Sequence, residues 1–226
     1  MTEEIIRRTE RFLREQLAAM AEYEGVGQRA EDYRIEHSLR VANVGREIAA
    51  KEGLDEEKLV VACLLHDVGY ARKFKDDADF LNHGRYSAEI ARPFLASLGY
   101  SDADVDEMCF GIAIHVDDKA DFEHERTPLA LSVGDADNID RFDAYRLDEN
   151  LLFADYVNLT LEQQRAYCEK RIAGLTRLRG MEFGTKTATA MWQEKIDYQL
   201  GFVRKLLAQI ENSTIEKLIE ASAAGC

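Results

Sequence analysis

The chain has 226 residues and a formal charge of −14, with 29 lysines and arginines against 43 aspartates and glutamates. Hydrophobic residues make up 46% of the chain, which is enough for a sizeable core. A surface this acidic repels nucleic-acid backbones and anionic lipids, so we expect neither a nucleic-acid polymer nor a membrane as partner. The acidic start, Met1 to Glu4, is unlike a signal peptide, and we expect a cytoplasmic protein.

The spacing of apolar residues predicts helices along most of the chain. In chain order they cover about 3–22, 32–52, 55–65, 84–98, 101–115, 129–139, 160–179 and 187–209. Residues 72–79 and 116–126 are charged or polar and predict loops, and 143–158 shows no clear pattern. No alternation of period two indicates a strand. The predicted fold class is therefore all-α.

Several of these helices carry sequence signals at their ends. Gly53 and Gly99 are placed to end two of them, and Asp55 and Ser101 are placed to cap the next ones. Thr160 begins a capping box. The glycine pair Gly25 and Gly27 predicts a break after the first helix, and Gly69 predicts the end of the third. The small residues at the C-terminus predict a frayed end.

The most informative residues are histidines on otherwise apolar helix faces. His37 lies on an apolar stripe, and His66 ends a helix that is apolar on all sides and therefore buried. Asp67 follows directly, where the partial negative charge of the helix end makes a buried carboxylate costly. A divalent metal would resolve this, because imidazoles and carboxylates are its usual ligands. Alternatively, the histidines are hydrogen-bonded core residues and Asp67 pairs with an arginine.

A second acidic segment lies close behind an apolar stretch. Asp135, Asp137 and Asp140 fall within six residues. On a helix, Asp135 and Asp137 point in different directions, so one of these carboxylates could face inward as a metal ligand. The alternative is a solvated acidic face.

Together these elements resemble a known family. The order of His37, the pair His66 and Asp67, and the segment 135–140 resembles the H…HD…D signature of the HD-domain phosphohydrolases. The segments 83–91 and 112–115 resemble family segments whose histidines bind a second metal. The resemblance covers about 33–142 and implies an HD-type helical bundle. We expect one domain, with a metal-binding core at about 30–145 and C-terminal helices at about 150–220 packed on that core.

The resemblance implies a ligand set for one divalent ion (Mn, Mg, Co, Fe or Ni) and for a second. The first site would use His37, His66, Asp67 and Asp137, with Asp135 as the fallback for the last ligand. The second would use His83 and His115, with Asp67 bridging. The paired histidine and the Gly-Tyr-Pro element of the members that cleave cyclic dinucleotides do not occur here, so we do not expect that activity.

By this resemblance the protein is a metal-dependent phosphohydrolase that cleaves a phosphoester or phosphoanhydride of a small molecule, a nucleotide being favoured. Asp67 would also orient the attacking water, as a catalytic residue. Positive side chains should neutralise the phosphate charge. The candidates are Arg40, Lys73 and Arg141, each of which could equally be an ordinary surface cation.

Two other functions fit the same residues. Some HD-fold proteins bind two irons with this pattern and oxidise a small diol or phosphonate; Tyr23 and Glu24, which such enzymes would use, stand at a poorly matching distance from His37. A non-catalytic HD sensor is the third possibility, against which the intact ligand set argues. A homodimer is compatible with the sequence, and residues 143–158 would line the pocket or form the dimer contact.

Overall fold

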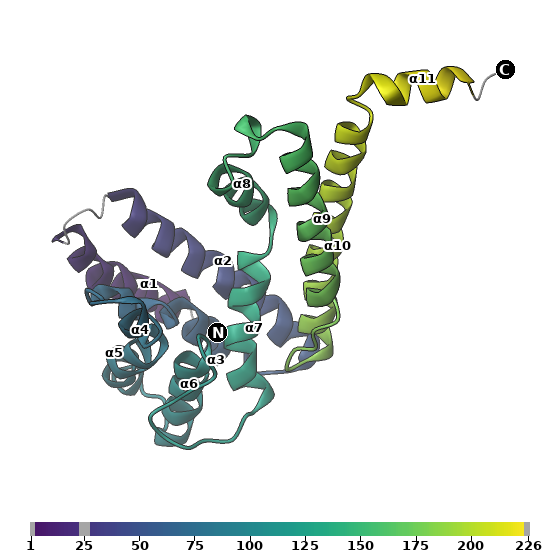
Figure 1. The fold of residues 1–226 in the computed structure, drawn as a ribbon. Helices are drawn as coiled ribbons and strands as arrows, with labels where there is room; N and C mark the ends of the chain where they lie inside the picture. Colours follow the sequence, from purple (N-terminus) through teal and green to yellow (C-terminus); the bar gives the residue numbers. More distant parts are fainter. Residues whose placement is uncertain (1–2, 23–27, 224–226) are drawn as a thin grey trace. The chain divides into compact units, whose positions relative to one another are not determined.

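A computed structural model describes residues 3–22 and 28–223 (Figure 1). The described residues form helices and no strand, which confirms the prediction of an all-α fold. They divide into two compact units. The first contains the chain up to Asp140 together with 183–189, and the second contains 141–182 and the chain from Ala190 onward. The single domain with C-terminal helices on its core stays a prediction.

The metal-binding core was predicted at about 30–145, and the first unit contains this core as far as Asp140. Its helices are α1 (Glu3–Leu17), η1 (Ala18–Glu22), α2 (Gln28–Glu52), α3 (Glu56–Leu65), η2 (Val68–Ala71), α4 (Asp77–Phe80), α5 (His83–Ser97), α6 (Asp102–Ile114) and α7 (Pro128–Arg141). Apart from η2 and α4, which were not predicted, their bounds agree with the sequence prediction to within a few residues. The glycines predicted to break the chain after the first helix, Gly25 and Gly27, lie outside the described residues.

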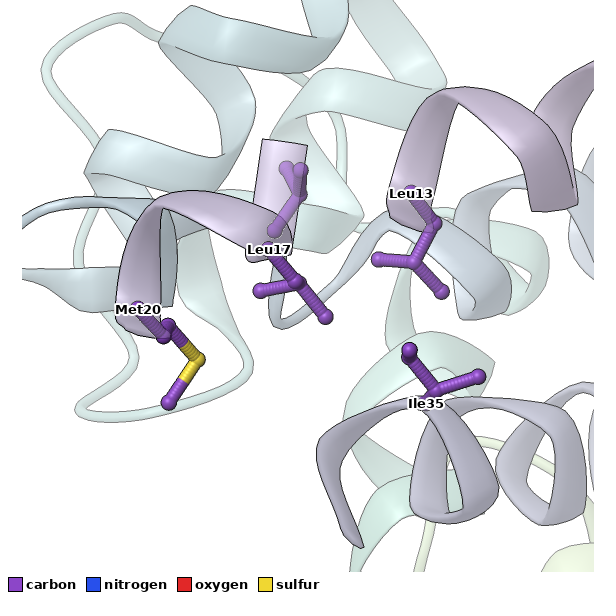
Figure 2. Close-up of a cluster of buried hydrophobic side chains, with 5 residues drawn as sticks. Leu13, Leu17, Met20 and Ile35 are labelled. Atoms are coloured by element: carbon purple, nitrogen blue, oxygen red, sulfur yellow. The ribbon is translucent and has the colours of Figure 1, made fainter. Parts of the chain in front are cut away.

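A small hydrophobic cluster fixes the N-terminal helices against the turn that carries Asp67. Leu13 and Leu17 of α1 pack with Met20, Ile35 of α2 and Val68 of η2. Figure 2 shows the side chains of Leu13 and Leu17 pointing toward the helix that carries Ile35. Each leucine or isoleucine buried in this way stabilises the fold by about 1.5–3 kcal/mol. The cluster therefore fixes the position of the first turns of α2 relative to the turn that follows α3.

The predicted helix caps are formed. Asp55 accepts a hydrogen bond from the backbone N–H of Lys58 at the start of α3, and Ser101 accepts one from Asp104 at the start of α6. Gly53 and Gly99 follow α2 and α5 with φ angles of +69° and +90°, which glycine adopts without strain. All residues of α3 from Leu59 to Leu65 are buried, as its apolar sequence predicts.

Gly69 has a different role from the predicted one. It lies inside η2, after α3 has already ended, and its φ angle is not positive. A Cβ atom at this position would collide with the carbonyl oxygen of His83 and lie 2.9 Å from the backbone nitrogen of Ser87. The glycine is needed because the turn after Asp67 runs directly against the first turn of α5.

The segment 72–79 is not entirely a loop, contrary to the prediction. A single helical turn, α4, forms within it because Asp76 caps the backbone N–H of Asp79. None of the α4 residues is buried. The high charge of this segment, which favoured a loop, instead supplies the capping carboxylate and keeps the turn at the surface.

Helices α5, α6 and α7 approach each other closely through glycine. A Cβ at Gly84 of α5 would lie 2.5 Å from the carbonyl oxygen of Ala113 in α6. A Cβ at Gly111 of α6 would lie 2.7 Å from the carbonyl oxygen of Ala130 in α7. This close packing brings His83 and His115, which stand at the ends of α5 and α6, toward α7.

The second unit is built from α8 (Ala144–Phe153), η3 (Tyr156–Asn158), α9 (Leu161–Leu178), most of α10 (Lys186–Glu211) and α11 (Ile215–Ala223). The capping box at Thr160 is confirmed. Trp192 of α10 is buried, donates a hydrogen bond from its ring nitrogen to the carbonyl of Leu178, and packs on Phe142. The helix α11 was not predicted from the sequence, and residues 224–226 of the predicted frayed end lie outside the described residues.

Large apolar side chains are exposed on α8 and η3. Leu152, Phe153 and Val157 are exposed by 72%, 96% and 85%. These side chains are of the type that a partner surface covers, but the predicted role of 143–158 in a homodimer or a pocket stays a prediction. No described helix combines the length and the hydrophobicity needed to cross a lipid bilayer.

Candidate metal centre

Four histidines and two aspartates from five segments of the chain meet in the first unit. His37, His66 and Asp67 offer ligand atoms within 4.8 Å of one another. The same holds for His66, His115 and Asp137, and for Asp67, His83 and His115. The structure thus brings together all six residues that the sequence assigned as metal ligands.

The first half of this cluster is formed by α2, α3 and α7. The ring Nε2 of His37 lies 3.0 Å from Asp137 Oδ1 and 3.3 Å from the Nε2 of His66. Asp67 Oδ2 lies 3.7 Å from the Nε2 of His37 and 3.6 Å from that of His66. These four side chains are almost completely buried.

The second half uses the other oxygen of the same carboxylate. Asp67 Oδ1 lies 3.5 Å from the Nε2 of His83 and 3.6 Å from the Nε2 of His115. One carboxylate therefore presents one oxygen to each pair of imidazoles. Asp67 therefore lies between the two pairs of imidazoles, and its bridging of two ions, which the resemblance implied, stays a prediction.

The outer ring nitrogen of each histidine is already engaged. The Nδ1 atoms of His66, His83 and His115 donate to the carbonyl oxygens of Cys63, Phe80 and Ile112 at 2.6–2.7 Å. The Nδ1 of His37 donates to Asp140 Oδ2 at 2.8 Å. With the proton held on Nδ1, each neutral ring presents the lone pair of Nε2 to the centre of the cluster.

Asp140 and Arg40 form an outer layer around His37. The guanidinium of Arg40 donates to both oxygens of Asp140, at 2.8 and 3.2 Å. Arg40 was predicted to bind the phosphate, and that role stays a prediction; the contact shown here is to Asp140. Asp140 was not assigned a role from the sequence. Its position three residues after Asp137, on the same helix face, was the available signal.

Arg34 is a second residue that the sequence reasoning missed. Its NH1 donates to Asp67 Oδ2 at 2.9 Å, and its guanidinium lies 3.8 Å from the ring centre of Tyr70. The ring centre of Tyr33 lies 5.5 Å from the same guanidinium. Arg34 stands three residues before His37 on α2, so helical spacing could have indicated it.

The charges of the cluster shift the protonation of its members. Burial alone would lower the pKa of His37, but hydrogen bonds to Asp137 and Asp140 outweigh it and raise the pKa to about 9. Burial lowers the pKa of His66 to about 4. Burial opposes ionisation of Asp67, yet the nearby His66 and Arg34 hold its pKa well below the usual range.

The donor set fits a divalent metal. Two neutral imidazoles whose Nε2 atoms face each other at 3.3 Å repel unless a cation or a proton lies between them. Ligand atoms that share one ion at bond lengths near 2.1 Å stand about 3–4 Å apart, which matches the distances above. When His37 is neutral, as a metal-bound imidazole is, the three carboxylates Asp67, Asp137 and Asp140 against the two guanidinium groups leave one net negative charge. A divalent cation would turn this into a positive site for an anion.

The remaining candidates do not join the cluster. Asp135, the fallback ligand, is buried but accepts a hydrogen bond at 2.9 Å from the backbone N–H of Gly184. It points away because it stands two residues from Asp137 on the same helix. Lys73 is exposed between η2 and α4, and Arg141 is exposed at the end of α7. Phosphate binding by these two residues stays a prediction.

The comparison with known families agrees with this geometry. Residues 34–144 match the family model described as HD domain. The protein contains an HD domain. The matched residues hold all six clustered side chains, and the bounds agree with the resemblance expected over 33–142.

Two individual proteins are also similar to this HD-domain chain. A solved structure described as a predicted HD superfamily hydrolase from an uncultured Thermotogales bacterium superposes with a TM-score of 0.59 and 22% identity. That superposition covers 90% of this chain and 91% of the other, and it shows a shared fold. Ribonuclease Y of Mycoplasma mycoides is 42% identical over 60 residues, which are 26% of this chain and 14% of that protein.

Proposed function

We propose that this protein is a metal-dependent phosphohydrolase that acts on a small phosphorylated molecule, with a nucleotide as the favoured substrate. The observation that carries the proposal is the buried set of four imidazoles and two carboxylates, arranged around the two oxygens of Asp67. Divalent cations held by such ligands polarise a phosphoryl oxygen and lower the pKa of water. The HD domain and the resemblance to a predicted HD superfamily hydrolase support the same class of reaction.

The protein's own side chains supply the rest of the chemistry. Asp67 accepts a hydrogen bond from the attacking water and so aligns it with the phosphorus, while Arg34 keeps the carboxylate ionised. Among the described residues, the hydrogen bond of Arg34 to Asp67 uses only one of its N–H donors. The other donors bind a phosphoryl oxygen of the substrate, as charge-assisted hydrogen bonds.

The aromatic rings beside Arg34 support a nucleotide as the substrate. Tyr33 and Tyr70 are partly buried, and their ring centres lie 5.5 and 3.8 Å from the guanidinium. Aromatic rings of this kind stack on nucleobases. A nucleotide whose phosphate is held by Arg34 would therefore have the ring of Tyr33 or Tyr70 within reach of its base.

The test is a phosphate-release screen over nucleoside mono-, di- and triphosphates with Mn²⁺, Mg²⁺, Co²⁺ and Fe²⁺, run with the wild type and with Asp67→Ala. We expect release that requires added metal and is lost in the variant. Release that needs no metal and survives the substitution would contradict the proposal. A single-stranded RNA arm tests the prediction that a polymer is not a substrate, since one relative is a ribonuclease.

The complete second half of the cluster also favours a second candidate, a di-iron oxygenase acting on a small diol or phosphonate. The two functions differ in what the metal does with oxygen. Protein produced in iron-rich medium would show two irons per chain, a visible chromophore and substrate-dependent oxygen uptake if it were an oxygenase. Phosphate release without oxygen uptake would identify the protein as a phosphohydrolase and exclude the oxygenase.

A further inference from the structure

The two halves of the cluster differ in what orients their histidines. His66 is held by the carbonyl of Cys63 inside the buried helix α3, and His115 by the carbonyl of Ile112 inside the buried helix α6. The Nδ1 of His83 instead donates at 2.7 Å to the carbonyl of Phe80, the last residue of α4. A histidine of the second half is therefore oriented by a surface segment.

The rings around His83 come from the same part of the chain. The ring centre of Phe80 lies 4.9 Å from that of His83, and Tyr70 and Phe74 follow at 5.1 and 6.2 Å. Phe80 is nevertheless 39% exposed. The ring of His83 can point its Nε2 at Asp67 Oδ1 only while these neighbours are in place.

A four-residue helix cannot persist on its own, because a single turn does not offset the cost of helix nucleation. Asp79 supplies the missing attachment. Its carboxylate accepts a hydrogen bond from the hydroxyl of Tyr86 on α5 at 2.5 Å and another from the backbone N–H of Lys75 at 2.9 Å. The backbone N–H of Asp79 donates to the side chain of Asp76 at 2.8 Å. One carboxylate thus closes the segment on itself and fastens it to the helix that carries His83.

We propose that Asp79 is a positioning residue for the second half of the metal cluster, and that the segment Phe74–Asn82, fastened through Asp79 and Tyr86, decides whether that half binds an ion. The first half is assembled by buried helices and binds its ion without this segment. The inference rests on the metal binding in the proposed function. It makes the second ion the weaker one and the one whose occupancy depends on the order of the segment.

The test is a calorimetric titration of the metal-free protein with Mn²⁺, with bound Mn²⁺ also counted by electron paramagnetic resonance. Tyr86→Phe removes only the hydroxyl, and Asp79→Ala removes the carboxylate together with both hydrogen bonds that it accepts. We expect two equivalents in the wild type. In both variants the first affinity is unchanged and the second falls at least about tenfold, the effect typical of losing a group that orients a ligand. Asp77→Asn is the matched control, because Asp77 lies on the same turn and makes no side-chain hydrogen bond among the described residues; it should behave as the wild type.

Amide hydrogen exchange provides a readout independent of metal. Exchange at residues 80–83 should quicken in Tyr86→Phe and Asp79→Ala and stay unchanged in Asp77→Asn. The inference is overturned if both variants keep the wild-type second affinity, if both affinities fall equally, or if the wild type binds only one ion. A wild type that binds no Mn²⁺ would remove the proposed function as well. Thermal unfolding of each metal-free variant shows whether it remains folded.

Discussion

The carboxylate of Asp140 accepts a hydrogen bond from the ring Nδ1–H of His37, at a distance of 2.8 Å and across 103 residues of sequence. This contact turns the opposite ring nitrogen of His37 toward Asp137 and Asp67. Arg40 in turn holds Asp140 through both of its carboxylate oxygens. The first half of the cluster therefore depends on an ion pair that touches none of the proposed metal-binding nitrogens.

Asp140→Asn should weaken binding of the first metal ion by about 10–100-fold, the usual effect of losing an outer partner of a metal-binding histidine. The amide still fits the space but no longer carries the charge that pairs with Arg40 and strengthens the donor nitrogen. Calorimetric titration with Mn²⁺ measures the change. Asp102→Asn, an exposed acidic residue in the first turn of α6, removes the same charge and should leave the affinity unaltered. Equal affinities for all three proteins would show that Asp140 does not orient His37.

Arg34→Lys should lower kcat/KM for the best substrate of the phosphate-release screen by about 10–100-fold, which corresponds to one or two charge-assisted hydrogen bonds. Lysine keeps the positive charge beside Asp67 but cannot donate in two directions from a fixed plane or stack on Tyr70 as the guanidinium does. Steady-state kinetics, with metal content measured for each protein, would check this. Lys73→Ala serves as the comparison, because Lys73 is exposed and forms no ion pair with the described residues. A larger loss in Lys73→Ala than in Arg34→Lys would assign the phosphate contact to Lys73.

Removal of metal should destabilise the protein. Without a cation, the Nε2 atoms of His37 and His66 face each other at 3.3 Å, and the buried carboxylates of Asp67 and Asp137 lose the positive charge that the ion adds to that of Arg34 and His37. An ion present at 100 times its dissociation constant stabilises the native state by about 2.7 kcal/mol. In a chain of this length that corresponds to a rise of about 5–10 °C in Tm. Thermal unfolding with EDTA and with added Mn²⁺ would reveal the shift, and coinciding curves would argue against a metal centre.

Gly69→Ala should destabilise the fold by about 1–3 kcal/mol, the typical cost of overpacking. The added methyl group meets the backbone of His83 and Ser87, which cannot move aside as a flexible side chain could. Gly174→Ala is the matched substitution, because Gly174 lies inside α9 and its Cβ would meet no atom within 4 Å. That change should stabilise the protein by about 0.5–1 kcal/mol. Urea unfolding compares the two, and an unchanged midpoint for Gly69→Ala would disprove the close approach of η2 to α5.

Much of the helical structure could be read from the sequence because its causes are local. The capping residues Asp55, Ser101 and Thr160 each accept a hydrogen bond from the backbone N–H three residues further on. Position 53 has a positive φ, which glycine adopts most easily. The continuous apolar run of α3 likewise indicates burial without knowledge of its neighbours. The prediction was weakest in segments of mixed composition, where α4 formed in a predicted loop and α11 formed where no helix was predicted.

For the candidate metal centre, the sequence by itself determined which residue types are available and, through their family pattern, the six side chains that the structure gathers. Tertiary structure alone decided their partners: Asp137 faces the histidines while Asp135 binds the backbone of Gly184, and Arg34 is the cation that touches Asp67. The physical reason is the range of the forces involved. Helix propensity and capping act within one turn of chain, whereas a buried charge is satisfied by whichever group the packing of distant helices brings within about 3 Å.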